Sequence, residues 1–276
     1  MTFDDTTVRL ALLAVATGVL AGALGSWVVL RRQAFLAHAS GATAFAGASV
    51  AATAALPVLP VALASSAIVA ALTGRLAARR PEAAQVATGL ALSCGLAIGV
   101  IATRSGAPQT GTSVLLGSTL LASDADIITT LVVAGVAVAL AFALGRWWLA
   151  GALHPQGRAG VFSGAGWIAR QADLVLLLMV GVAAAALLPV AGALLAGTLL
   201  VVPAATAQRI APHPRQLVPL AGIIATAEVL GALLIADATD LPPGASVALL
   251  AAAVDIVVAI GVGARVRGAR PKVAAA

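Results

Sequence analysis

Long apolar stretches, each cut by charged residues, glycine or proline, follow one another along almost the whole chain. A helix crosses the hydrocarbon core of a bilayer with about 20 apolar residues. The stretches are continuous, whereas the strands of a membrane barrel alternate apolar and polar residues. The pattern therefore predicts an all-α polytopic membrane protein with about nine transmembrane helices, at residues 8–30, 34–54, 58–74, 84–103, 125–145, 172–188, 190–208, 216–236 and 243–264.

The connections between these predicted helices differ in length. Only residues 55–57 separate the second helix from the third, and only Pro189 separates the sixth from the seventh. Both pairs are therefore expected to form tight hairpins. Pro203 is expected to bend the seventh helix, because proline has no backbone N–H to donate. Residues 105–123 surround a short apolar patch with Gly, Ser and Thr, which favours a re-entrant or interfacial helix.

Positive charges indicate the orientation, because Lys and Arg gather in cytoplasmic loops. With the N-terminus outside and the C-terminus in the cytoplasm, all 16 Lys and Arg residues except Arg9 and Arg104 fall on the cytoplasmic side. The same arrangement makes residues 146–170 a long cytoplasmic loop. The acidic start of the chain is unlike a signal peptide, so we expect the first helix to be retained. We expect residues 1–276 to form a single transmembrane domain.

Composition limits the chemistry that the chain can carry out. Of its 276 residues, 61% are hydrophobic and 9% charged, against about 45–50% and about 25% in soluble domains. We attribute the net charge of +6 to cytoplasmic loops facing anionic lipid, and not to nucleic-acid binding. Cys94 is the only cysteine and Lys272 the only lysine, so neither a disulfide nor a phosphate-binding P-loop can form. We expect no enzyme activity and no bound cofactor; any ATP hydrolysis belongs to another subunit.

Four segments in order along the chain resemble the integral permease of metal-importing ABC transporters of the zinc and manganese type. They are residues 30–36, 116–121 with 125–127, 192–207, and 240–245. The resemblance implies a multi-pass permease in the bacterial plasma membrane, forming a homodimer. It also implies two partners, an ATP-binding cassette ATPase subunit and an extracytoplasmic metal-binding protein. The loop at 146–170 resembles the one that docks on the ATPase, with candidate contacts His154, Pro155, Gln156 and Arg158.

The second helix departs from the family pattern. Family members carry an Asp and, four residues later, a His, and such a pair on one helix face can grip a divalent ion. Aligned on Gly47, this chain has His38 in place of the Asp and Ala42 in place of the His. Of the two positions of this pair, only His38 carries a side chain that can bind a metal ion. The alternative is that its imidazole only bonds Ser40 or a neighbouring backbone carbonyl.

Two carboxylates lie deep in the predicted helices, Glu228 in the eighth and Asp255 in the ninth. This segmentation puts no Arg or Lys at comparable depth. An ionisable group inside the bilayer is costly and therefore suggests a function. Both are candidates to line a cation path together with His38. The alternative is that each is protonated and bonded to nearby Ser, Thr or backbone groups.

Three classes of function remain open from the sequence. The first is the permease of an ABC importer for a divalent metal ion, zinc or manganese. The second keeps the ABC architecture and changes the cargo to a siderophore, haem or cobalamin, which the missing Asp–His pair favours. The third is a secondary transporter or a structural membrane protein that works alone. Secondary carriers often show inverted repeats, and no convincing repeat is found in this sequence.

The orientation is testable with single cysteines. In a Cys94→Ala background, cysteines introduced at Ser105 and at Ser163 should react with an impermeant thiol reagent from opposite sides of the membrane. Ser105 should label in intact cells and Ser163 only after permeabilisation. Labelling of both positions in intact cells would contradict the predicted topology.

Overall fold

The computed structural model describes residues 6–105, 123–153, 166–192, 195–239 and 241–268, and every regular element in these ranges is helical. The elements are α1 (Thr6–Leu20), η1 (Ala21–Gly25), α2 (Ser26–Leu30), α3 (Ala34–Thr53), α4 (Val58–Arg79), α5 (Pro81–Ser105), α7 (Asp124–Leu153), α8 (Gly166–Ala186), α9 (Leu188–Ala191), α10 (Ala196–Ile210), α11 (Pro214–Thr239) and α12 (Pro243–Gly268). The all-α prediction is confirmed, and each expected apolar segment overlaps a helix, although the one expected at 190–208 is divided between α9 and α10.

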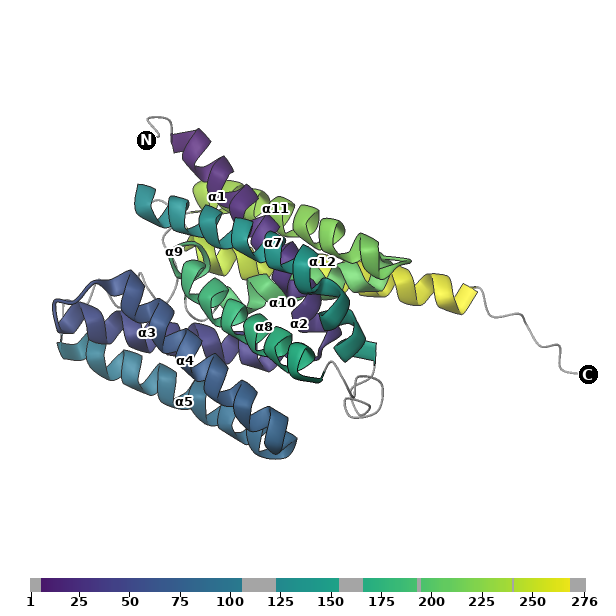
Figure 1. Ribbon diagram of the computed structural model, residues 1–276. Coiled ribbons are helices and arrows are strands. Elements are labelled where there is room, and N and C mark those ends of the chain that lie inside the picture. The colour runs from purple at the N-terminus through teal and green to yellow at the C-terminus, as the bar shows by residue number, and fades with distance from the viewer. Residues whose placement is uncertain (1–5, 106–122, 154–165, 193–194, 240, 269–276) are drawn as a thin grey trace, which may run out of the picture.

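The helices form two groups, and α8 and α10 connect them (Figure 1). On one side, α3 packs against α4 and α5; on the other, α1 packs against α7 and α11. The connecting helices are α8, which contacts α4, α3 and α7, and α10, which contacts α3, α11 and α12. The short helix α10 therefore lies between the two groups of longer helices.

Seven helices in the described part of the chain are long and apolar enough to cross a membrane. The other two expected spans lie in α8, whose apolar part is Gln171–Ala186, and in the 15-residue α10. The outward faces of the long helices carry exposed Ile, Leu, Val and Phe side chains. Such apolar faces are expected to contact lipid. The chain is a multi-pass membrane protein.

Helix ends follow local chemistry at several predicted boundaries. Ser123 and Asp126 form reciprocal bonds at the start of α7: Ser123 N donates to Asp126 Oδ2 over 2.9 Å, and Asp126 N donates to Ser123 Oγ over 3.3 Å. The tight hairpin at 55–57 is confirmed, and Ala55 adopts a positive φ of 53° in it. At the start of α7, Asp124 also pairs with Arg9 of α1 at 3.0 Å, so these two helices begin at the same end of the bundle.

Two expected boundaries were wrong. Pro189 does not form a hairpin turn on its own: it lies in the short helix α9, where the first turn needs no proline N–H, and Gly192 with φ of 73° follows before α10. The helix expected at 125–145 continues to Leu153, so residues 146–153 are helical and not loop. The expected re-entrant segment at 105–123 lies almost wholly outside the described residues.

Small residues bring the backbones of neighbouring helices into contact. Gly181 of α8 lies so close to α4 that a Cβ atom there would be 2.9 Å from Ser66 O. Ser66 Oγ bridges the same contact, 2.8 Å from Gly181 O and 3.0 Å from Ser40 O of α3. Helices in lipid gain little from hydrophobicity, so close packing and such hydrogen bonds hold them together.

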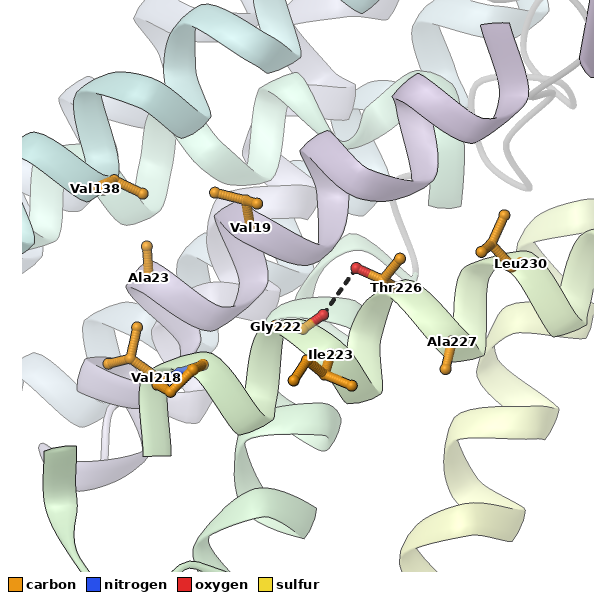
Figure 2. A pocket seen from close by; sticks show the side chains of 10 residues that line it. Val19, Ala23, Val138, Val218, Gly222, Ile223, Thr226, Ala227 and Leu230 are labelled. Carbon is orange, nitrogen blue, oxygen red and sulfur yellow. Dashed lines mark hydrogen bonds between the residues drawn. The ribbon is translucent and has the colours of Figure 1, made fainter. Parts of the chain in front are cut away.

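A groove of about 510 Å³ opens between α1, α7 and α11 (Figure 2). Its walls are apolar side chains, among them Val19, Val138 and Ile223. Its one side-chain hydroxyl, Thr226 Oγ1, already donates to Gly222 O of its own helix over 2.8 Å. Because this single hydroxyl is the one polar side-chain group in an otherwise apolar lining, the groove offers too few ligands to be a candidate for the transport path.

The packing at Gly181 is testable against a matched position. Gly181→Ala should lower stability by about 1–3 kcal/mol, because the added methyl group meets the backbone of Ser66 and Ala67. Gly135→Ala, where nothing lies within 4 Å of the new Cβ, should raise stability by up to about 1 kcal/mol through helix propensity. Unfolding in mixed detergent measures both, and equal effects would contradict the close contact of α8 with α4.

Candidate functional site: polar groups around helix α10

Helix α10 has the candidate polar groups at its two ends. Its first turn contacts α3 near His38, and its last turn reaches Asp255 of α12. In the middle, Leu200 O meets Gly25, at the end of the π-helical segment η1, so closely that only glycine fits there. Pro203 lies inside α10, as predicted. A short helix with one missing backbone hydrogen bond therefore links α3, η1 and α12.

His38 is half-buried in the first turns of α3. Its Nδ1 lies 3.0 Å from Ala34 O, one turn back in the same helix, so Nδ1–H donates to that carbonyl. This bond leaves the Nε2 lone pair directed to α10, where Thr198 Oγ1 lies 3.5 Å away. The carbonyl bond considered from the sequence is present. Ser40 Oγ, the other partner considered, has no hydrogen bond among the described residues.

Close contact with Gly197 fixes His38 against α10. A Cβ atom at Gly197 would lie 2.8 Å from both Cα and Cγ of His38, so no larger residue fits without moving one helix. The position of Ala42, where the family pattern has the His, is different. Ala42 is buried, and a Cβ at Gly95 of α5 would lie 2.9 Å from its carbonyl carbon. The close approach of α5 therefore requires glycine at position 95, and Ala42 itself lies inside the bundle.

Asp255 is paired with an arginine, which the sequence analysis did not foresee. Thr206 Oγ1 donates to Asp255 Oδ1 over 3.0 Å, and Arg209 donates from Nε to Oδ1 over 3.0 Å and from Nη2 to Oδ2 over 3.3 Å. The expectation that no Arg lies at the depth of Asp255 was wrong. It placed Arg209 in a loop because the predicted helix ended at residue 208, whereas α10 continues to Ile210.

Glu228 lies in the middle of α11 and is only 2% exposed. Neither carboxylate oxygen has a hydrogen-bond partner among the described residues. The expected bonds to Ser, Thr or backbone groups are therefore not found there. A buried carboxyl without a partner is costly, and it needs a proton, a water molecule or a cation to offset that cost.

The three candidate ligands do not form one site within a single chain. Thr198, beside His38, and Thr206, beside Asp255, are about 12 Å apart along α10 at 1.5 Å per residue. Ligands of one metal ion all lie within about 2.6 Å of it. In agreement, no group of three or more His, Cys, Asp or Glu side chains in the described part of the chain is placed to hold a metal ion.

The expected ATPase contacts cannot be placed in the same way. His154, Pro155, Gln156 and Arg158 lie outside the described residues, between the end of α7 and the start of α8.

Arg209 is the polar residue that sequence reasoning missed. Its signal was the spacing of Thr206 and Arg209, three residues apart on one helical face.

The Arg209–Asp255 pair can be tested by a double-mutant cycle. Arg209→Gln should lower the free energy of unfolding by about 1–3 kcal/mol, because it removes two of the three donors to a largely buried carboxylate. Asp255→Asn should lower the free energy of unfolding by less than Arg209→Gln does. The Arg209 side chain is 45% exposed, so its charge can still be solvated when Asp255 is replaced. The double variant should recover part of the loss. Additive losses would contradict the pair.

Comparisons with known proteins agree with this architecture. The model of the ABC 3 transport family matches residues 4–261. PsaBC from Streptococcus pneumoniae, in complex with Fab, has a similar fold: TM-score 0.77, 21% identity, covering 92% of this chain and 91% of that chain. A structure described as an inward-facing conformation of a metal-chelate type ABC transporter gives TM-score 0.69 and 17% identity, covering 93% and 86%. No curated protein matches the sequence. Since the family model spans nearly the whole chain, the protein belongs to the ABC 3 transport family and is the membrane-spanning permease subunit of an ABC transporter.

Proposed function

We propose that this permease imports a divalent metal ion, zinc first and manganese second, across a bacterial plasma membrane. The observation that carries the proposal is the fixed orientation of His38. Its Nδ1 is bonded to Ala34 O, which turns Nε2 toward the first turn of α10, where an ion could bind it in place of the long contact with Thr198 Oγ1. Neutral imidazole nitrogen is a good ligand for zinc.

Zinc fits the described side chains better than manganese does. Manganese prefers oxygen ligands. Of the two carboxylates, Asp255 is already paired with Arg209, and Glu228 lies enclosed on α11. The described residues hold no group of three or more His, Cys, Asp or Glu side chains placed to bind an ion. An oxygen-rich site would therefore have to use a carboxylate that Arg209 already binds or one that is buried, whereas an imidazole site needs only His38 and its counterpart.

We propose that two copies of the chain form the transport path. One imidazole makes a weak site, so two symmetry-related His38 side chains would partly replace the missing Asp–His pair. The open faces of α5 and α12, the least buried of the seven long apolar helices, support an interface between copies. Arg209, 45% exposed beside α12, supports it too, because a charged group inside a span is expected to adjoin protein or water and not lipid.

Membership of the family implies an ATPase and a substrate-binding partner. It excludes the carrier that works alone, which the sequence left open. We propose that the substrate-binding partner is an extracytoplasmic metal-binding protein. We also propose that the ATPase docks on the cytoplasmic segment at 146–170, through the residues between α7 and α8 that include His154, Pro155, Gln156 and Arg158. This arrangement requires the N-terminus outside and the C-terminus in the cytoplasm.

A metal chelate is the second candidate cargo. The missing partner of His38 favours it, and so does the fold that the chain shares with a transporter described as metal-chelate type, at TM-score 0.69. A siderophore, haem or cobalamin would be held by its organic part, and the path would then need no side-chain ligand for the metal itself.

Uptake of zinc by the assembled transporter tests the proposal. In proteoliposomes with the ATPase and the binding protein, His38→Ala should reduce zinc uptake by tenfold or more, because the imidazole ligand is lost. His213→Ala, at an exposed histidine between α10 and α11, is the matched control and should retain uptake. Omitting the ATPase should abolish both uptake and ATP hydrolysis.

Two carboxylate variants separate the alternatives. Normal uptake by His38→Ala, with loss of uptake by Glu228→Gln or Asp255→Asn, would move the ion site to the carboxylates. Normal zinc uptake by all three would contradict a side-chain ligand. Absence of zinc uptake by the wild-type complex, with uptake of a chelate, would favour the second cargo.

A further inference from the structure

A buried arginine ties three helix ends together at the end of the bundle opposite to the Arg9–Asp124 pair. Arg31 directly follows α2, and its side chain is only 4% exposed. Its guanidinium group forms an ion pair with Asp173 Oδ1 of α8 and donates from Nη1 to Trp148 O of α7 over 3.4 Å. One side chain therefore contacts α2, α7 and α8 together.

Aromatic and backbone contacts stiffen the same junction. Trp148 is fully buried, and its Nε1 donates to Ala172 O of α8 over 2.8 Å. The ring of Trp27 on α2 packs edge to face against that of Trp148, with centroids 5.6 Å apart and planes at 66°. We name Trp27, Arg31, Trp148 and Asp173 the three-helix clamp. It holds each pair of the three helices by at least one direct contact.

The clamp residues lie on both sides of the connection between α7 and α8. Trp148 lies in the last turns of α7, which ends at Leu153. Asp173 lies at the end of the second turn of α8, which begins at Gly166. The segment between them contains the residues that we propose as the ATPase contact. The clamp therefore joins the two helix ends that flank this segment to each other and, through Arg31, to the end of α2.

From α2 the contacts continue to the candidate ion path. The helix from Thr6 to Leu30 is continuous through η1, and Gly25 at the end of η1 packs directly on Leu200 O of α10. The first turn of the same α10 contacts His38. Helices in direct contact thus join the clamp to the side chain that we propose as the ion ligand.

We propose that Arg31 is a positioning residue for energy coupling: with Asp173 and Trp148 it makes the ends of α2, α7 and α8 move as one body when the ATPase acts on the loop. This inference rests on the proposed docking of the ATPase at 146–170. Arginine suits the role because its planar group keeps its charge and directs several donors at fixed angles, whereas lysine offers a single mobile ammonium group. Arg32, the next residue, is exposed and takes no part in the clamp.

The test measures zinc uptake per ATP hydrolysed in the complete transporter. Arg31→Lys and Asp173→Asn should each reduce this ratio by fivefold or more while ATP hydrolysis continues, because the loop moves without carrying α2. The exchange variant Arg31→Asp with Asp173→Arg should regain part of the ratio. Arg32→Gln is the matched control and should keep the wild-type ratio.

The outcomes distinguish this inference from the proposed function. Wild-type uptake per ATP in assembled Arg31→Lys and Asp173→Asn complexes would overturn the coupling role and leave the proposed cargo intact. Failure of the wild-type complex to take up zinc would contradict the cargo, and the stimulation of ATP hydrolysis by the loaded binding protein would then report coupling in the same variants. Loss of assembly in every clamp variant, the exchange included, would assign Arg31 a purely structural role and overturn the inference.

Discussion

Backbone contact between helices is the constraint on which the rest of this structure depends. In lipid, apolar side chains gain little by leaving their surroundings for one another, so attraction between helices comes from close packing and from hydrogen bonds. Glycine and serine provide both here. The backbone of α4 lies against Gly181, and Leu200 O lies against Gly25. The hydroxyl of Ser66 on α4 contacts backbone carbonyls of α3 and α8. Each of these contacts fixes the rotation of a helix about its own axis.

Fixed rotation decides which polar groups meet. Because Gly197 packs closely on His38, the imidazole stays at the first turn of α10, away from Asp255 at the other end of this helix. In the same way, the position of α10 against α12 presents Thr206 and Arg209 to Asp255. His38 and Asp255 thus lie at opposite ends of one short helix, and the described residues of the chain do not bring three ligands together around one ion.

The sequence predicted most of the helices because charges, glycine and proline mark their ends. The helix expected at 34–54 is observed at Ala34–Thr53, and the one expected at 243–264 begins at Pro243 as foreseen. It could not predict η1 or α9, because both depend on what packs against them and not on local propensity. The partner of Asp255 was missed for a similar reason. Whether Arg209 belongs to a loop or to the last turn of a helix is decided by neighbours that hydropathy does not reveal.

The shortness of α10 limits how far it can line an ion path. Its 15 residues extend about 22 Å at 1.5 Å per residue, less than the roughly 30 Å of bilayer hydrocarbon. An ion that travels beside this helix would therefore have to continue along neighbouring elements to cross the whole layer. The helices that meet its two ends are α3, at His38, and α12, at Asp255.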